Sequence, residues 1–200
     1  MRWLTPEDLS KIYGVPALAS TRKVAHHLTD AYRAHIQRAR FCILSTVGPE
    51  GTDASPRGDD GPVVRELDPQ TLAMPDWRGN ERIDSPKNIA RDDRVSMMFL
   101  IRGSGNVIRI NGRARITDDP DLRASFTHDG KQPRTVIVIR IAEVYFQCAR
   151  AVIRAGLWSG QDDSAGLPTP GQILASLTDN EVGGDAYDTA WPIRAAQTMW

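Results

Sequence analysis

Two neighbouring stretches of the sequence, residues 55–59 and 75–85, combine anion donors with residues that favour tight turns. A helix that begins near the end of the second stretch would add free backbone amides to them. Together these groups have the chemistry of a phosphate site, since guanidinium forks and helix N-termini both bind phosphate oxygens. The alternative is an exposed loop whose arginines pair locally with Asp76, Glu81 and Asp84. The donor side chains are three arginines, an amide and a hydroxyl: Arg57, Arg78, Arg82, Asn80 and Ser85.

The other side chains that could take part in catalysis or metal binding form no comparable group. Cys42 and Cys148 are the only cysteines, too few for a disulfide framework and not in a metal-ligand spacing. Cys148 resembles a nucleophile but has no base nearby, because His128 lies in a separate loop, so we interpret it as a structural thiol. Adjacent histidines such as His26 and His27 point about 100° apart on a helix, which disfavours a shared metal. We expect no metal site, and no spacing places two carboxylates across a reacting bond, so the catalytic residues stay unknown.

Sequence patterns predict which elements position these groups. Helices are expected from Thr5 to about Gly14, after Pro16 and from about Ser85 to Arg91, because capping residues and early prolines mark helix starts. We predict the second helix as one continuous element, because four apolar residues recur at every fourth position: Val24, Leu28, Tyr32 and Ile36. Short β-rich runs are expected to form an antiparallel barrel: residues 41–47, 71–75, 95–101, 107–117 and 135–148.

The charge balance limits the partners that the protein can have. Lysines and arginines number 25 and acidic residues number 25, so the formal net charge is zero. A nucleic-acid partner or an anionic membrane surface is therefore disfavoured. Acidic and polar residues near the start, among them Thr5, Glu7 and Asp8, do not fit a signal peptide, and no apolar run is long enough to cross a membrane. These observations predict a cytoplasmic protein.

Four motifs taken together resemble the pyridoxamine 5′-phosphate oxidase-like flavoproteins. The likeness covers residues 9–158 and is closest to the branch of probable FMN-dependent enzymes of unassigned substrate. No dinucleotide-binding or P-loop fingerprint competes with it. The motifs are Leu44-Ser45-Thr46, the run 55–59, Pro75-Asp76 with residues 79–85, and residues 108–114.

The resemblance implies a mainly β fold with flanking helices (α+β), built on a six-stranded antiparallel split β-barrel of the FMN-binding type. It also implies a homodimer with FMN in clefts between the subunits. The expected divisions are residues 1–40 as N-terminal helices that pack on the barrel, 41–158 as the barrel, and 159–200 as a loosely held C-terminal extension. The extension has little apolar surface apart from one amphipathic stretch, residues 171–177.

The same resemblance assigns FMN contacts residue by residue. The phosphate would lie near Arg57, Arg82 and Ser85, and loss of Arg82 would weaken FMN binding about tenfold or more. Trp77 stands where a second cationic residue is expected, and it would stack on flavin or substrate, or else anchor its own loop or a subunit contact. The remaining contacts are the strand end at Pro75 and Asp76, the ribityl or phosphate contacts Asn80 and Asn88, and the cleft and dimer-seam arginines Arg109, Arg150 and Arg154.

A flavin carries its own redox chemistry, so the resemblance implies an oxidoreductase that passes hydride or electrons between a small molecule and FMN. Oxygen, a nicotinamide, a deazaflavin or another protein would all be compatible as the second electron partner. The alternative is a non-catalytic split-barrel module that stores or senses FMN or haem, because fold resemblance alone does not separate the two.

Overall fold

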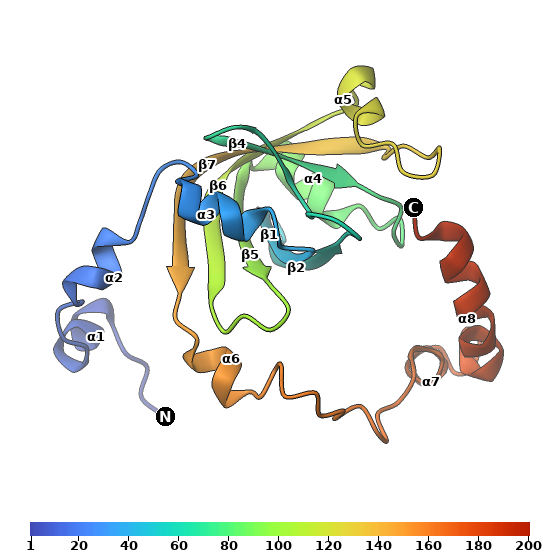
Figure 1. Ribbon diagram of the computed structural model, residues 1–200. Coiled ribbons are helices and arrows are strands. Elements are labelled where there is room, and N and C mark those ends of the chain that lie inside the picture. The colour runs from blue at the N-terminus through green and yellow to red at the C-terminus, as the bar shows by residue number, and fades with distance from the viewer.

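The computed structural model describes residues 1–200 and is built around one antiparallel sheet of seven strands (Figure 1). The order across the sheet is β2-β1-β5-β6-β7-β4-β3, so β2 and β3 are its edges, and no strand pairing joins them. The strands are β1 (Phe41–Gly48), β2 (Gly51–Gly58), β3 (Arg65–Asp68), β4 (Thr71–Asp76), β5 (Arg94–Leu100), β6 (Val107–Thr117) and β7 (Thr135–Gln147).

The five strands predicted from the sequence are confirmed within about one residue at each end, but the expected count of six is wrong. Both additional strands lie at an edge of the sheet. β2 contains Pro56, which an edge strand tolerates because its missing N–H need not join a ladder. β3 has four residues and a bulge between Glu66 and Asp68, so its alternation is too short to recognise. The run 55–59, which none of the five predicted strands includes, therefore belongs mainly to β2.

β6 and β7 are the longest strands and form the central ribbon of the sheet. Their register shifts between Asn111 and Gly112, which marks a β-bulge. A Cβ atom on Gly112 would overlap the carbonyl oxygen of Arg140 on β7, so the close approach of the two backbones requires glycine there. Alternate residues on these strands and their neighbours fill one core, with Leu44, Met97, Phe99, Ile108, Ile110, Ile137 and Ile139 all essentially inaccessible.

Three helices precede the sheet: α1 (Pro6–Ile12), α2 (Leu18–Arg22) and α3 (Asp30–Ile36). Thr5 caps α1 as expected. The single helix predicted after Pro16 is wrong, because the chain leaves helical geometry between α2 and α3. There the N–H and C=O of Ala25 pair with Val144 on β7, and Thr29 begins α3 as its N-cap. Leu28 and Ile36 are still buried in the core, so the apolar stripe marked burial rather than a continuous helix.

The remaining helices are short except for the last. α4 (Asp84–Arg91) matches its prediction and packs Ile89 into the core. α5 (Pro120–Ala124) and α6 (Arg150–Arg154) flank β7, while α7 (Pro170–Leu177) falls on the predicted amphipathic stretch. α8 (Gly184–Thr198) was not predicted. None of the helices is both long and apolar enough to cross a membrane.

α7 and α8 lie to one side of the sheet in Figure 1, and the end of the chain returns toward the loop between β4 and α4. α8 buries none of its residues, and the chain from α6 to α7 is exposed throughout. The extension therefore meets the rest of the molecule mainly at its last residues.

Candidate functional site

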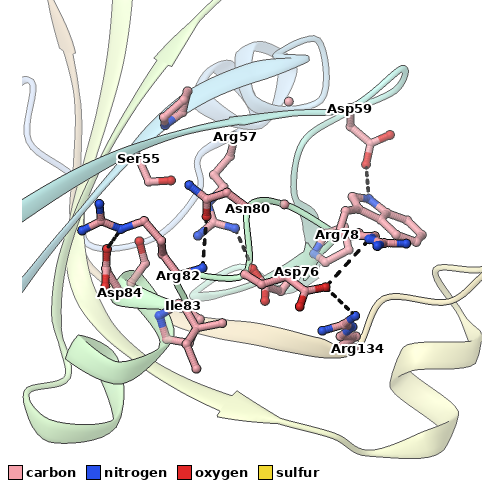
Figure 2. A pocket seen from close by; sticks show the side chains of 18 of the residues that line it. Ser55, Arg57, Asp59, Asp76, Arg78, Asn80, Arg82, Ile83, Asp84 and Arg134 are labelled. Carbon is pink, nitrogen blue, oxygen red and sulfur yellow. Dashed lines mark hydrogen bonds and ion pairs between the residues drawn. The ribbon is translucent and has the colours of Figure 1, made fainter. Parts of the chain in front are cut away.

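A pocket of about 1000 Å³ opens between β2, the end of β4, and the loop that leads into α4 (Figure 2). Its size is at the upper end of the range of small-molecule and cofactor sites. Asp53, Ser55 and Arg57 reach it from β2, because alternate residues of a strand share a face. Arg134 at the start of β7 and the last two residues of the chain complete the lining.

Arg57 is the most buried cation of the pocket. Its Nη1 donates to Oδ1 of Asp76 at 2.6 Å, and both side chains are only 18% exposed. Oδ2 of Asp76 lies 3.5 Å from the Thr135 hydroxyl, which ties the carboxylate to β7. The Nε of Arg57 is buried and has no hydrogen-bond partner. An unpaired buried donor on a charged group is costly, so this N–H is a ready place for an acceptor atom of a ligand.

The N-terminus of α4 faces the same pocket. Its N-cap residue, Ile83, supplies no side-chain acceptor, so no cap bond satisfies the first backbone amides of the helix. Ser85, which is 3% exposed, donates its hydroxyl to Oδ2 of Asp53 at 3.2 Å. A hydroxyl and uncapped amides at the positive end of a helix form an anion-binding arrangement.

The loop before α4 is held in an unusual backbone conformation. Glu81 has φ of 62° and Ile83 has φ of 51°, in the left-handed region that a β-branched residue rarely adopts. The backbone N–H of Arg82 donates to Oδ1 of Asn80 at 3.2 Å, which closes the loop on itself. Strained non-glycine residues of this kind concentrate at functional sites.

Most of the pocket's arginines are paired with carboxylates. Arg82 Nε donates to Asp84 at 2.8 Å, while Arg134 and Arg78 share the carboxylate of Glu81 at 3.0 and 3.9 Å. Four arginines and six carboxylates line the cavity altogether. An anion would therefore have to bind at the unpaired Nε of Arg57 and at backbone amides, or displace a carboxylate from one of the exposed pairs.

Two aromatic rings, those of Trp77 and Trp200, line one end of the pocket, and both contact His128 behind them. Trp77 donates its Nε1–H to Asp59 at 3.0 Å, so the ring is anchored to the loop that follows β2. The rings of Trp77 and Trp200 meet edge to face with centroids 5.3 Å apart, and His128 lies 4.3 Å from Trp200. The loop-anchoring interpretation of Trp77 is consistent with this bond.

The structure brings together six of the ten predicted cofactor-binding residues. Four others do not line the pocket of a single chain. Asn88 lies on the side of α4 that faces β1 and donates to the Thr46 hydroxyl at 3.1 Å. Arg109 stacks over Tyr145 with 5.2 Å to the ring centroid, and Arg150 and Arg154 are exposed on α6. The six lining residues are Arg57, Pro75, Asp76, Asn80, Arg82 and Ser85.

Sequence reasoning missed Arg134, Met199 and Trp200. Arg134 reaches the pocket because Asp76 pairs with Thr135 across β4 and β7, a contact between positions 59 residues apart. Arg134 could have been predicted only if the pairing of β4 with β7 had been known. No local signal points to Trp200, which enters the site from the far end of the chain. No group of three or more metal-ligating side chains is assembled anywhere.

The fold and the pocket together define a class of protein. Its members have an antiparallel sheet, with arginine–carboxylate pairs gathered between an edge strand and a helix N-terminus. The sequence model of the family described as pyridoxamine 5′-phosphate oxidase matches residues 28–148. Because that span is more than half of the chain, the protein belongs to the pyridoxamine 5′-phosphate oxidase family, as the motif resemblance implied.

Two solved structures of HupZ support the fold. HupZ of Group A Streptococcus superposes with a TM-score of 0.51 at 16% identity, over 60% of this chain and 94% of HupZ. A variant of HupZ gives 0.50 at 16% identity, over 60% and 98%. General Stress Protein 26 of Bacillus anthracis is more distant, with a TM-score of 0.44 at 19% identity over 57% and 88%. No curated protein matches the sequence.

Proposed function

We propose that the protein binds FMN in this pocket and serves as an oxidoreductase for a small molecule. The observation that carries the proposal is the buried, unpaired Nε of Arg57 in one cavity with Ser85 and the uncapped N-terminus of α4. This donor set fits a phosphomonoester, since it offers a guanidinium, a hydroxyl and backbone amides.

The chain's own residues would bind and orient the cofactor. Arg57, Ser85 and the first amides of α4 would hold the phosphate, and Asn80 and Arg82 would flank it from the strained loop. Pro75 and Asp76 would present the end of β4 to the ring. Bound FMN supplies hydride and electron transfer, so the protein need only position its substrate and exclude water. The proposed substrate is a small molecule, and the proposal names no particular electron acceptor.

A homodimer accounts for the predicted contacts that lie outside the pocket. Arg109 shares the outer face of the sheet with Met98, Ile43 and Tyr145, which are aligned across neighbouring strands. Met98 is 36% exposed there. We infer that this face and α6 belong to the subunit contact, so that Arg109, Arg150 and Arg154 of a second copy would reach the first copy's flavin.

Titration of the purified protein with FMN and riboflavin tests the phosphate assignment. We expect FMN to bind at least tenfold more tightly, because a charge-assisted contact contributes about 1.5–3 kcal/mol. Arg57→Ala should weaken FMN about tenfold or more and leave riboflavin nearly unchanged. Arg82→Ala should have a smaller effect than the tenfold loss expected from the resemblance, because that side chain is 75% exposed and already paired.

Arg91→Ala is the matched control, since Arg91 lies on the same helix and pairs with Glu50 outside the pocket. It should bind FMN like the native chain. Equal affinity for FMN and riboflavin, or normal FMN binding by Arg57→Ala, would contradict the phosphate site. Reduction of the bound flavin by a donor and its reoxidation by an acceptor would separate an oxidoreductase from a storage or sensor module.

A further inference from the structure

The last residues of the chain line one end of the pocket. The ring of Trp200 contacts both His128 and Trp77, with interplanar angles of 36° and 84°. Met199 and Trp200 both contribute to the cavity lining. The end of the chain approaches the site from α8, which is set apart from the sheet in Figure 1. An indole ring therefore forms part of the pocket wall and contacts the rings of Trp77 and His128.

The two receiving rings are fixed by the sheet-bearing part of the molecule. Trp77 is anchored through Asp59, as described above. His128 sits on a tight turn in which its backbone exchanges hydrogen bonds of 2.9 Å with Lys131 in both directions. The carboxylates of Asp129 and Asp60 lie 3.6 and 4.0 Å from its ring nitrogens. Trp77 and His128 thus form a face of two rings, with centroids 6.5 Å apart and an interplanar angle of 71°.

The segment that carries Trp200 is held much less firmly. One hydrogen bond connects α8 to the rest of the sheet-bearing chain, from Lys131 Nζ to the Gln197 carbonyl oxygen at 3.4 Å. α8 has no buried residue and contains Pro192, which interrupts its hydrogen bonding. Because few contacts oppose its release, detachment of residues 197–200 costs little compared with unfolding of the sheet.

We infer that the Trp77–His128 face is the subsite for a planar aromatic ring of the substrate, and that Trp200 is its internal competitor. The inference rests on the proposed function, since it assigns the substrate side of the same pocket. Edge-to-face and offset packing of aromatic rings gives a flat ring a specific advantage over an aliphatic ring of the same size. A ligand that binds only when residues 197–200 are released has an apparent affinity reduced by the fraction of released molecules.

Binding of 2-naphthoate to the full-length chain tests this subsite by calorimetry. Decahydro-2-naphthoate serves as the non-aromatic probe of the same charge. Trp200→Ala should bind 2-naphthoate about tenfold more tightly than the native chain, as expected if the segment is docked about nine-tenths of the time. Trp200→Phe should bind it with intermediate affinity. Adding Trp77→Ala to Trp200→Ala should remove most of the gain, and the saturated probe should bind weakly throughout.

Trp191→Ala is the control variant, because Trp191 is 54% exposed on the same helix and stacks with Arg194. It should leave 2-naphthoate binding unchanged. Equal binding by the native chain and Trp200→Ala would overturn the inference. So would an equal gain for the two probes, which would indicate a generic apolar cavity rather than a ring subsite.

FMN titration of the same variants separates this inference from the proposed function. Trp200→Ala should bind FMN within about twofold of the native chain. A tenfold gain for FMN without a gain for 2-naphthoate would assign the face to the flavin and overturn the inference. A native chain that binds no FMN would refute the proposed cofactor, while the comparison of 2-naphthoate affinities would still decide the subsite.

Discussion

Arg57 and Arg82 carry the same guanidinium group but differ in what surrounds them. Arg57 is largely shielded from solvent, pairs with Asp76 and has a buried Nε–H without a partner. Arg82 is largely exposed and pairs with Asp84 two residues away. Exposed pairs contribute little because water and salt screen them, whereas a buried donor must find an acceptor. At the residue scale, Arg57 is therefore the stronger candidate for the anion contact, a ranking that residue type alone could not provide.

The two cysteines also differ in environment rather than in type. Burial raises the pKa of the Cys42 thiol to about 12, although the charge of Arg57 opposes the shift. The pKa of the exposed Cys148 is lowered, chiefly by a hydrogen bond from the backbone of Arg150, with smaller effects from the charges of Arg150 and Lys23. The thiolate is the reactive form, so Cys148, interpreted from the sequence as a structural thiol, is exposed and is the more reactive of the two thiols toward an added reagent.

We expect one thiol per native chain to react with a disulfide reagent at neutral pH, and two after unfolding. Cys148→Ser should abolish the native reaction. Because the native state keeps the Cys42 proton, that thiol stabilises the fold fully below its ordinary pKa of 9.0, and the contribution is lost as the pH rises toward 12. Two reactive thiols in the native protein at neutral pH, counted by absorbance, would contradict the burial of Cys42.

At the scale of elements, the β6–β7 ribbon positions the residues at the start of β7 that meet the pocket. β7 pairs with β4 near Asp76 and with β6 along its length, so a bend in the ribbon sets where Arg134 and Thr135 meet the pocket. The bulge at Gly112 is the irregular point of this ribbon. Bulges bend and twist strands locally, and this one depends on a residue without a side chain.

Gly112→Ala should destabilise the protein by about 1–3 kcal/mol, because the added methyl group overlaps the Arg140 carbonyl and the backbone must shift. Urea unfolding measures the change. Gly14→Ala is the matched control, since nothing lies within 4 Å of a Cβ there, and it should be close to neutral. Equal midpoints for the two variants would show that the ribbon accommodates a side chain at the bulge.

At the scale of the whole molecule, the extension after α6 contributes nothing to the main core. All of the clustered core residues lie between Leu28 and Val144. α7 and α8 pack on each other, with Asp188 accepting from the backbone N–H of Gly171 at 2.9 Å. The predicted division at residue 159 is compatible with this arrangement, and we propose that the extension controls access to the site.

Removal of residues 161–200 should leave the proposed homodimer and the proposed FMN binding largely intact, since neither the core nor the proposed phosphate contacts are lost. Iodide should quench the fluorescence of bound flavin faster in the shortened protein, because the ring end of the pocket is uncovered. Sedimentation and quenching measurements test the two expectations. An FMN-free monomer or an aggregated product would instead assign the extension to the subunit contact.

Local sequence patterns were enough to predict most elements and the chemical character of the site. Five strands, α1, α4 and α7 follow from alternation, caps and prolines, which act over a few residues. The clustering of Arg57, Asn80, Arg82 and Ser85 was also predictable, because the motifs that contain them are close in the chain. Local patterns could not predict the edge strands β2 and β3, nor the break between α2 and α3, because these depend on pairing with distant segments.

Tertiary structure alone decided which groups are paired, buried or free. The Arg57–Asp76 pair, the approach of Arg134 and the docking of Trp200 join positions 19 to more than 100 residues apart. Such contacts arise when the sheet brings its strands together, and no spacing in the sequence encodes them. The unpaired Nε of Arg57 and the aromatic face beneath Trp200 are therefore properties of the folded chain, because burial and stacking exist only after the core has formed.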